Sequence, residues 1–272
     1  MSSDNRLVAG RFPRASQYHP DWVIKNSMGS NALWLAEWLT AAMELAPGMR
    51  VLDLGCGRAA SSIFLAREFD VQVWATDLWI SASENLLRIA DAGLQDRVFP
   101  IHADARALPY AGEFFDAIIS LDSYSYYGTD DLYLNYLAHF VKGNGQIGIA
   151  GAGLVQEIEG GLPDHLNAFW TQDFWCLHSA PWWRRLWERT GIVDMELAEA
   201  MLDGWNVWLE WQRTAHPANS VEISAIEADA GQTLGYIRMV ARRRADAKLE
   251  TYCWPDSMLS YPLEYEKQCL LR

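Results

Sequence analysis

The chain has 272 residues and a formal net charge of −13, and half of its residues are apolar, which suits one large α/β domain with a small cap. The acidic balance excludes the clustered Lys and Arg that nucleic acids and anionic membranes require, so we expect neither a nucleic-acid partner nor stable membrane association. The four cysteines show no paired spacing, so we expect neither disulfides nor a metal site. We see no apolar leader and no run of about 20 apolar residues, and we therefore expect a reduced, cytoplasmic protein.

The first 46 residues predict an arm followed by a helix. Residues 1–20 are polar and locally basic, and apolar residues then recur at helical spacing over Asp21–Ala46. Pro47 and Gly48 end this pattern. Within it, Asn26–Asn31 is rich in amides and glycine, and it is either a loop that closes over a ligand or the start of a helix capped by Ser30.

The most informative stretch is the turn after the first predicted strand. An apolar run beginning at Val51 contains Asp53 and ends at Gly55 and Gly57, and a helix is expected over Ser61–Phe69. Glycines there let a ligand approach bare backbone. A dinucleotide pyrophosphate would meet the like charge of Asp53, whereas a cation such as the sulfonium of S-adenosylmethionine would be attracted. We therefore expect the Asp53 carboxylate to face a cationic nucleoside.

The next two strands end in residues suited to adenosine. Asp77 follows the strand-like run from Val71 to Thr76, where an acid accepts both hydroxyls of a ribose. Leu78 or Trp79 directly follows and is placed to pack on a purine. A capping box, Ser81-x-x-Glu84, opens a helix over Ala82–Ala92. After the third strand, Arg97–His102, the carboxylate of Asp104 and the backbone N–H of Ala105 suit the adenine edge.

The fourth strand, Phe115–Leu121, is apolar throughout and carries Ser120 near its end. A polar and aromatic loop over Asp122–Gly128 follows it. In open α/β sheets ligands bind beyond the carboxyl ends of strands, where the strand order reverses. In the doubly wound strand order 3-2-1-4-5 the first and fourth strands flank that reversal. This loop is therefore the best candidate for an acceptor site, and the alternative is that it is simply a packed aromatic loop.

This ordered series resembles the successive motifs of class I S-adenosylmethionine-dependent methyltransferases. The resemblance covers Met49–Ala150 and rests on Asp53-x-Gly55-x-Gly57, Asp77, the segment Ala103–Pro109 and Phe115-Asp116. Within that class the chain is similar to the small-molecule branch near cyclopropane-fatty-acid synthases and quinone-biosynthesis methyltransferases. Ala59 departs from the pattern, because the family often has a third glycine there. The resemblance implies a Rossmann-like, seven-stranded, mostly parallel sheet with helices on both faces.

The second half predicts the remaining elements. We expect a helix capped by Thr129, a fifth strand over Gln146–Ala150 and an irregular aromatic insertion, residues 151–180, that serves as a lid. The pattern then predicts, in order, a helix over Pro181–Thr190, a strand over Ile192–Leu197, a tryptophan-rich helical stripe near Trp208, a helix over Ser220–Ala230 and a strand over Thr233–Ala241. The stripe suits a core or a subunit contact, which leaves a homodimer open. The domain thus spans residues 47–245, and residues 246–272 form an aromatic tail.

We therefore expect S-adenosylmethionine-dependent methyl transfer to a small-molecule acceptor at oxygen, nitrogen or carbon. The predicted cofactor contacts are Asp53, Gly55, Gly57, Asp77, Leu78, Asp104, Ala105 and Ser120. The predicted acceptor-side residues are Asp122, Tyr124, Tyr126 and, from the lid, His178 as a base. The alternatives are a cyclopropane-synthase-like lipid modification, an NAD(P)-dependent oxidoreductase and a non-catalytic cofactor-binding protein.

Overall fold

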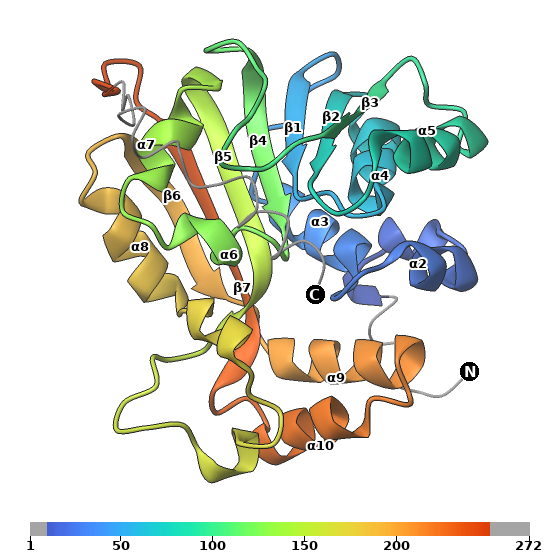
Figure 1. Cartoon of the computed structure of the whole chain (residues 1–272), viewed down its shortest axis with the longest axis vertical. Coiled ribbons are helices and arrows are strands. Elements are labelled where there is room, and N and C mark those ends of the chain that lie inside the picture. Colours follow the sequence, from blue (N-terminus) through green and yellow to red (C-terminus); the bar gives the residue numbers. More distant parts are fainter. Residues whose placement is uncertain (1–9, 251–272) are drawn as a thin grey trace, which may run out of the picture.

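The computed structural model describes residues 10–250, and these contain a seven-stranded sheet in the order β3-β2-β1-β4-β5-β7-β6 (Figure 1). The strands are β1 (Arg50–Leu54), β2 (Gln72–Asp77), β3 (Val98–His102), β4 (Phe115–Leu121), β5 (Val141–Leu154), β6 (Val193–Ala200) and β7 (Leu234–Arg243). Only β7 runs against its neighbours in this sheet. The predicted fold class is confirmed.

The sheet is buried on both faces, and each central strand supplies two hydrophobic clusters. Val51 lies in a cluster with residues of α3 and α4, whereas Leu52 lies in the opposite cluster with residues of α7 and α8. Successive side chains of a strand point to opposite faces, so one apolar run serves both. This explains why β1 and β4 show continuous rather than alternating hydrophobicity.

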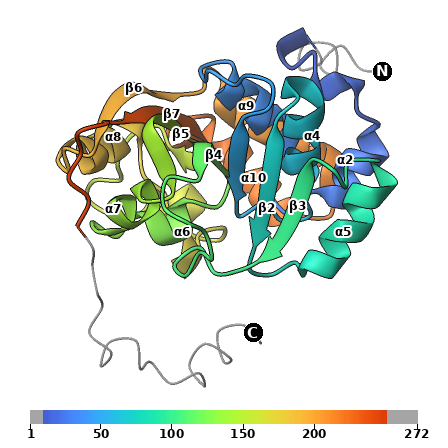
Figure 2. The ribbon, with the colours of Figure 1, turned by 90° about the horizontal axis from the view of Figure 1, so that it is seen from above.

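Helices flank the sheet and also lie beyond the carboxyl ends of its parallel strands. They are α2 (Pro20–Asn26), α3 (Ala32–Thr40), α4 (Ala60–Phe69), α5 (Ala82–Asp91), α6 (Ser125–Gly128), α7 (Tyr133–Ala138), α8 (Ala180–Glu188), α9 (Gly204–Ala215) and α10 (Ser220–Asp229). Two views agree that α4 and α5 lie by the β1–β3 half, and α6, α7 and α8 by the other half (Figure 2). Helices α9 and α10 lie beyond the carboxyl ends of the strands, beside the segment that follows β5 (Figure 1).

Several local predictions are confirmed. The capping box at α5 is present, with the Ser81 and Glu84 side chains each accepting from the other's backbone N–H. Strand β4 has the predicted bounds. Trp208 and Trp211 of α9 are buried in the core of this chain, which agrees with the core reading of the stripe. Within residues 10–250 the structure has no helix of the length and apolarity needed to cross a bilayer.

The single helix predicted over Asp21–Ala46 is wrong. The structure has two helices, α2 and α3, separated by an entry loop, residues 27–31. Asn31, rather than Ser30, caps α3, because its extended backbone lets its Oδ1 accept from the N–H groups of Leu33 and Trp34. The hydrophobic period alone does not reveal this break.

The region after β4 also differs from prediction. Thr129 does not begin a helix, because it stands at the carboxyl end of α6, and the next helix, α7, starts only at Tyr133. Strand β5 starts at Val141 rather than at the predicted Gln146, and its pairing with β4 is irregular, with a register shift between Phe115 and Ala117. It extends to Leu154 because β7 pairs with it over nine residues. The irregular part of the insertion therefore begins after Leu154.

The aromatic residues of the tail, Tyr252, Trp254, Tyr261 and Tyr265, lie outside the described residues. The same holds for Cys253 and Cys269. The two cysteines that the structure does describe, Cys56 and Cys176, are free thiols.

Candidate functional site

A cavity of about 610 Å³ lies at the carboxyl ends of β1, β2, β3 and β4. Its walls come from the entry loop, the turn after β1, the ends of β2 and β3 and the post-β4 segment, residues 122–127. The chain order reverses between β1 and β4, which places the cavity at the switch point where α/β sheets bind ligands. Its volume lies within the range of about 300–1,000 Å³ typical of small-molecule sites.

The turn after β1 needs its glycines for backbone and for space. Gly55 has φ +75°, and a Cβ there would lie 2.0 Å from the Ser123 Oγ. Gly57 has φ +53°, and a Cβ there would lie 3.0 Å from the Met28 sulfur. The turn can therefore approach both the post-β4 segment and the entry loop closely. Ala59 also adopts the left-handed region, with φ 57°, so alanine keeps the conformation expected of the family's third glycine.

Asp53 lies beneath this turn and does not line the cavity. Its Oδ2 accepts from the hydroxyls of Ser61 and Ser62, each at 2.6 Å, whereas its Oδ1 is buried without a partner in the described chain. The expectation that this carboxylate faces the ligand directly is wrong, because the serines of the first turn of α4 draw it inward. Burial raises the pKa of Asp53 to about 6. Its charge therefore acts on the cavity through Ser61, which does line it.

Asp77 lines the cavity at the end of β2 and is well hydrogen-bonded. Its Oδ2 accepts from the Gly57 N–H at 2.8 Å, and its Oδ1 accepts from the N–H groups of Trp79 and Ile80. These bonds tie the β1 turn to the end of β2. A carboxylate offers about four lone-pair sites, so three backbone donors leave Oδ2 able to accept one further hydroxyl.

The remaining predicted cofactor contacts divide into two groups. Gly55, Gly57, Leu78, Asp104 and Ala105 all line the cavity together with Asp77. Asp104 is held by Arg106, whose guanidinium lies 2.6 Å from the Asp104 Oδ2 and lowers the pKa of that carboxyl.

Ser120 does not line the cavity, contrary to expectation. Its hydroxyl is buried within the sheet and donates to the Leu54 carbonyl at 2.8 Å. It thus joins β4 to β1 below the cavity floor.

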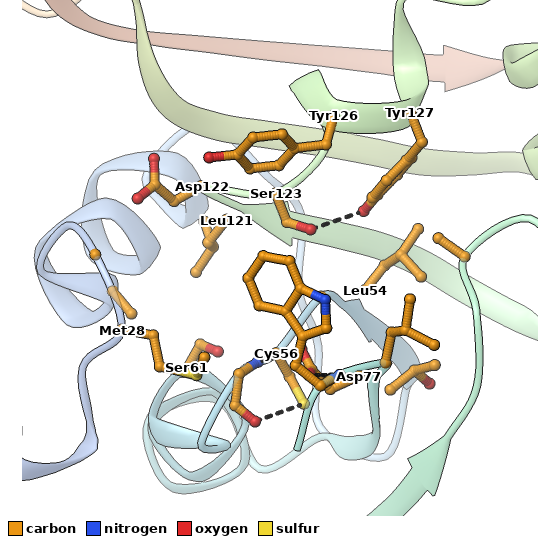
Figure 3. A pocket seen from close by; sticks show the side chains of 18 of the residues that line it. Met28, Leu54, Cys56, Ser61, Asp77, Leu121, Asp122, Ser123, Tyr126 and Tyr127 are labelled. Atoms are coloured by element: carbon orange, nitrogen blue, oxygen red, sulfur yellow. Dashed lines mark hydrogen bonds between the residues drawn. The ribbon is translucent and has the colours of Figure 1, made fainter. Parts of the chain in front are cut away.

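Figure 3 shows how the two long walls of the cavity face one another. Ser123, Tyr126 and Tyr127 lie on one side, and Cys56, Ser61 and Asp77 lie on the other, with Asp122 and Met28 toward one end. Burial raises the pKa of the Cys56 thiol well above its usual value, which excludes it as a ready nucleophile.

Asp122 and Tyr126 occupy the position expected of acceptor-side residues. Both line the first cavity and also a second, smaller one of about 300 Å³. Asp122 has φ 52°, and its oxygens accept from the backbone N–H groups of Ser30 at 3.0 Å and Ala152 at 3.1 Å. The carboxylate therefore holds the entry loop and β5 together while it faces both cavities.

Tyr124 and His178 are not placed as predicted. Tyr124 is buried in the core among Tyr127, Tyr133, Trp183 and Trp187, and it lines neither cavity. Burial raises the pKa of its hydroxyl well above the usual value, so it is a packing residue.

His178 lines neither cavity and has structural partners. Its Nδ1 lies 3.0 Å from the Glu157 Oε2, and its ring stacks on Trp182 at 3.6 Å between centroids. Glu157 also accepts from the backbone and hydroxyl of Ser179. His178 therefore anchors the start of α8 rather than serving as a base. The other lid histidine, His165, lies 2.9 Å from the buried Asp229 of α10.

The second cavity brings in residues that the sequence analysis missed. Helices α9 and α10 and the connection between them supply Trp208, Gln212, His216, Asn219 and Glu222. The first three recur at i, i+4 and i+8, which places them on one face of α9 and its end. The sequence signal that could have predicted this wall is a polar glutamine and a histidine at helical spacing after Trp208.

In the described residues no group of three or more His, Cys, Asp or Glu side chains is arranged to hold a metal ion.

A comparison with protein families matches residues 51–145 to a methyltransferase domain. The match begins at β1 and includes the turn, Asp77 and the post-β4 segment, so it covers the walls at the strand ends but not the entry loop. Residues 51–145 are therefore similar to a methyltransferase domain. The order of its seven strands, with β7 antiparallel, is the order typical of this fold.

Curated relatives match between about a third and a half of the chain. A methyltransferase of Streptomyces halstedii, GfsG, is 30% identical over 138 residues, which are 49% of this chain and 48% of the relative. A demethylmenaquinone methyltransferase of Mycobacterium sp. (strain KMS) is 37% identical over 92 residues, which are 34% of this chain and 36% of the relative. The chain thus spans about half or less of the length of these relatives.

A solved structure extends the similarity over more of the fold. The geranyl diphosphate C-methyltransferase of Streptomyces coelicolor A3(2), in complex with Mg²⁺, geranyl diphosphate and S-adenosyl-L-homocysteine, has a TM-score of 0.64 and 20% identity. The alignment covers 76% of this chain and 78% of that one. At this identity the likeness shows a shared fold.

Proposed function

We propose that this chain transfers the methyl group of S-adenosylmethionine to a small-molecule acceptor. The observation that carries the proposal is a pair of adjoining cavities. The first lies at the switch point of the sheet, and the second lies against α9 and α10. They share the lining residues Met28, Gly29, Ser30, Asp122 and Tyr126. A donor in the first cavity and an acceptor in the second would meet at these shared residues. Bound there, S-adenosylmethionine supplies an electrophilic sulfonium methyl.

The residues of the first cavity fit a cationic nucleoside. The unpartnered Oδ1 of Asp53 leaves buried negative charge behind the turn, which attracts a sulfonium or ammonium. Asp77 would accept a ribose hydroxyl, while Leu78, Asp104 and Ala105 would contact the adenine. The bare backbone of Gly55 and Gly57 would lie against the methionine portion.

Alignment is the main task that this proposal gives to the protein. An in-line displacement proceeds when the nucleophile, the methyl carbon and the leaving sulfur are held in order, and such positioning contributes several kcal/mol to catalysis. Asp122 and Tyr126 would orient the acceptor at the junction of the cavities. The entry loop, bonded to Asp122 through Ser30, would exclude water above it.

Calorimetry on the full chain tests the proposal. We expect S-adenosylmethionine and S-adenosylhomocysteine to bind with one site per chain and NADH to give no heat. A pooled extract of small metabolites should then support formation of S-adenosylhomocysteine. Binding of NADH alone would indicate the oxidoreductase alternative, whereas cofactor binding without turnover in any extract would indicate a non-catalytic binding protein.

A further inference from the structure

The second cavity has an acidic and aromatic lining that the proposed reaction does not by itself require. Among the described residues that line it, Asp122 and Glu222 carry carboxylates, His216 is the one titratable base, and none is Lys or Arg. Phe174, Trp208 and Tyr126 supply ring surfaces. A phosphate or carboxylate on the acceptor would meet like charge here, whereas a cation would gain from both the acids and the rings.

Gln212 provides an independent sign that a ligand with a hydrogen-bond donor belongs in this cavity. Its side chain is 5% exposed and lines the cavity, yet its Oε1 accepts no hydrogen bond within the described chain. An unpaired buried amide oxygen destabilises a protein, because it has given up its hydrogen bonds to water without gaining another. Because this oxygen is covered, the amide group has to turn by half a rotation to present it to the cavity, where a donor N–H from a bound molecule would satisfy it.

Glu222 is prepared for the same kind of ligand. Its Oε1 accepts from the Trp208 indole N–H at 2.8 Å, and its Oε2 accepts from the Asn219 amide at 2.6 Å. These neutral donors orient the carboxylate without neutralising it, and each oxygen keeps a free lone-pair site. The indole bond also places Glu222 at the edge of the Trp208 ring that lines the cavity.

We propose that the second cavity is the acceptor site for an amine, with Glu222 binding its ammonium form and Gln212 accepting one of its N–H bonds. This inference rests on the proposed methyl transfer and names its substrate class. In the reaction the amine first loses a proton to the Asp122 carboxylate at the junction of the cavities, and Asp122 passes that proton to water. The nitrogen lone pair then forms the N–C bond, and the C–S bond breaks with its electrons going to sulfur.

Three probes that share one ring frame test this inference by calorimetry on protein saturated with S-adenosylhomocysteine. They are tryptamine, tryptophol and indole-3-acetate, which carry an ammonium, a neutral hydroxyl and a carboxylate. We expect tryptamine to bind about tenfold more tightly than tryptophol, the effect of roughly one charge-assisted hydrogen bond, and indole-3-acetate to bind most weakly. Equal binding of the three, or a preference for the alcohol or the acid, would overturn the amine assignment.

Two variants assign the preference to named residues. Glu222→Gln keeps the shape but removes the charge, and Gln212→Leu removes the free amide oxygen. Glu222→Gln should lower tryptamine affinity by about tenfold and leave tryptophol affinity nearly unchanged. Gln212→Leu should lower the affinity for both probes, because the tryptophol hydroxyl can also donate to the amide oxygen. Glu227→Gln, on the same helix and paired with the exposed Arg213, is the matched control and should behave as wild type. An unchanged amine preference in Glu222→Gln would overturn the role of that residue.

The two levels of inference fail separately. S-adenosylhomocysteine binding reports on the first cavity, which neither Gln212 nor Glu222 lines, so it also shows that each variant is folded. If S-adenosylhomocysteine does not bind to wild type, the proposed methyl transfer fails. If it binds and the probes show no preference for the amine, only the acceptor class fails. Transfer of a labelled methyl group to tryptamine nitrogen would support both.

Discussion

The Asp122 Oδ2 accepts a hydrogen bond from the backbone N–H of Ser30 at 3.0 Å, across 92 residues of sequence. The bond joins the segment after β4 to the entry loop between α2 and α3. The Trp211 indole N–H donates to the neighbouring Gly29 carbonyl at 2.8 Å, so α9 holds the same loop from the other side. A Cβ on Gly29 would lie 2.8 Å from the Asp122 Oδ2, which explains a glycine at this contact.

Asp122→Asn should loosen the entry loop. The amide group of asparagine presents N–H toward one of the two backbone donors, Ser30 or Ala152, so one bond is lost and a repulsive contact replaces it. We expect faster hydrogen exchange at the Ser30 amide and a cofactor affinity weakened by about 1 kcal/mol. Asp131→Asn, at an exposed ion pair with Arg189, is the control. Unchanged exchange at Ser30 would show that other contacts hold the loop.

Asp77→Asn should weaken binding of S-adenosylhomocysteine by roughly 1–3 kcal/mol, because a charged acceptor for a ribose hydroxyl and for three backbone N–H groups becomes neutral. Isothermal titration calorimetry measures this loss. The exposed Asp91→Asn, at the end of α5, should bind as wild type. An Asp77→Asn protein that is folded and binds with wild-type affinity would contradict the ribose assignment.

Gly55→Ala should impair both folding and binding. The substitution places a Cβ at φ +75° and 2.0 Å from the Ser123 Oγ, so the post-β4 segment has to move away from the turn. We expect a loss of about 1–3 kcal/mol in the free energy of unfolding and no measurable cofactor binding. Gly112→Ala, where the nearest atom is 3.5 Å from the added Cβ, should change the free energy of unfolding by less than about 0.5 kcal/mol.

The affinity for S-adenosylmethionine should depend on pH through Asp53. Burial raises its pKa to about 6, so the carboxyl is ionised at pH 7 and increasingly protonated below pH 6. A bound cation favours the ionised form, and affinity should therefore be steady above about pH 7 and fall as the pH drops through 6. Asp53→Asn should flatten this profile. A fall of the same size in Asp53→Asn would assign the titration to another group.

Local sequence signals predicted those site residues that directly follow a strand in the chain. The glycines after β1, Asp77 after β2 and Asp104 after β3 are local in the chain, and parallel strands bring their carboxyl ends to one edge of the sheet. Residue type and spacing were enough to place them around one cavity. The capping box of α5 was equally local, since its bonds join residues three apart.

The tertiary structure alone decided which polar side chains reach the cavities. Asp53, Ser120, Tyr124 and His178 have the residue types of functional groups, yet partners elsewhere in the fold draw their side chains inward or aside. Gln212 and Glu222 line the second cavity because α9 and α10 pack beyond the strand ends, a placement set by tertiary packing rather than by any motif. Strand ends are ordered by backbone pairing, which the sequence pattern reveals, whereas a side chain's direction depends on neighbours distant in sequence.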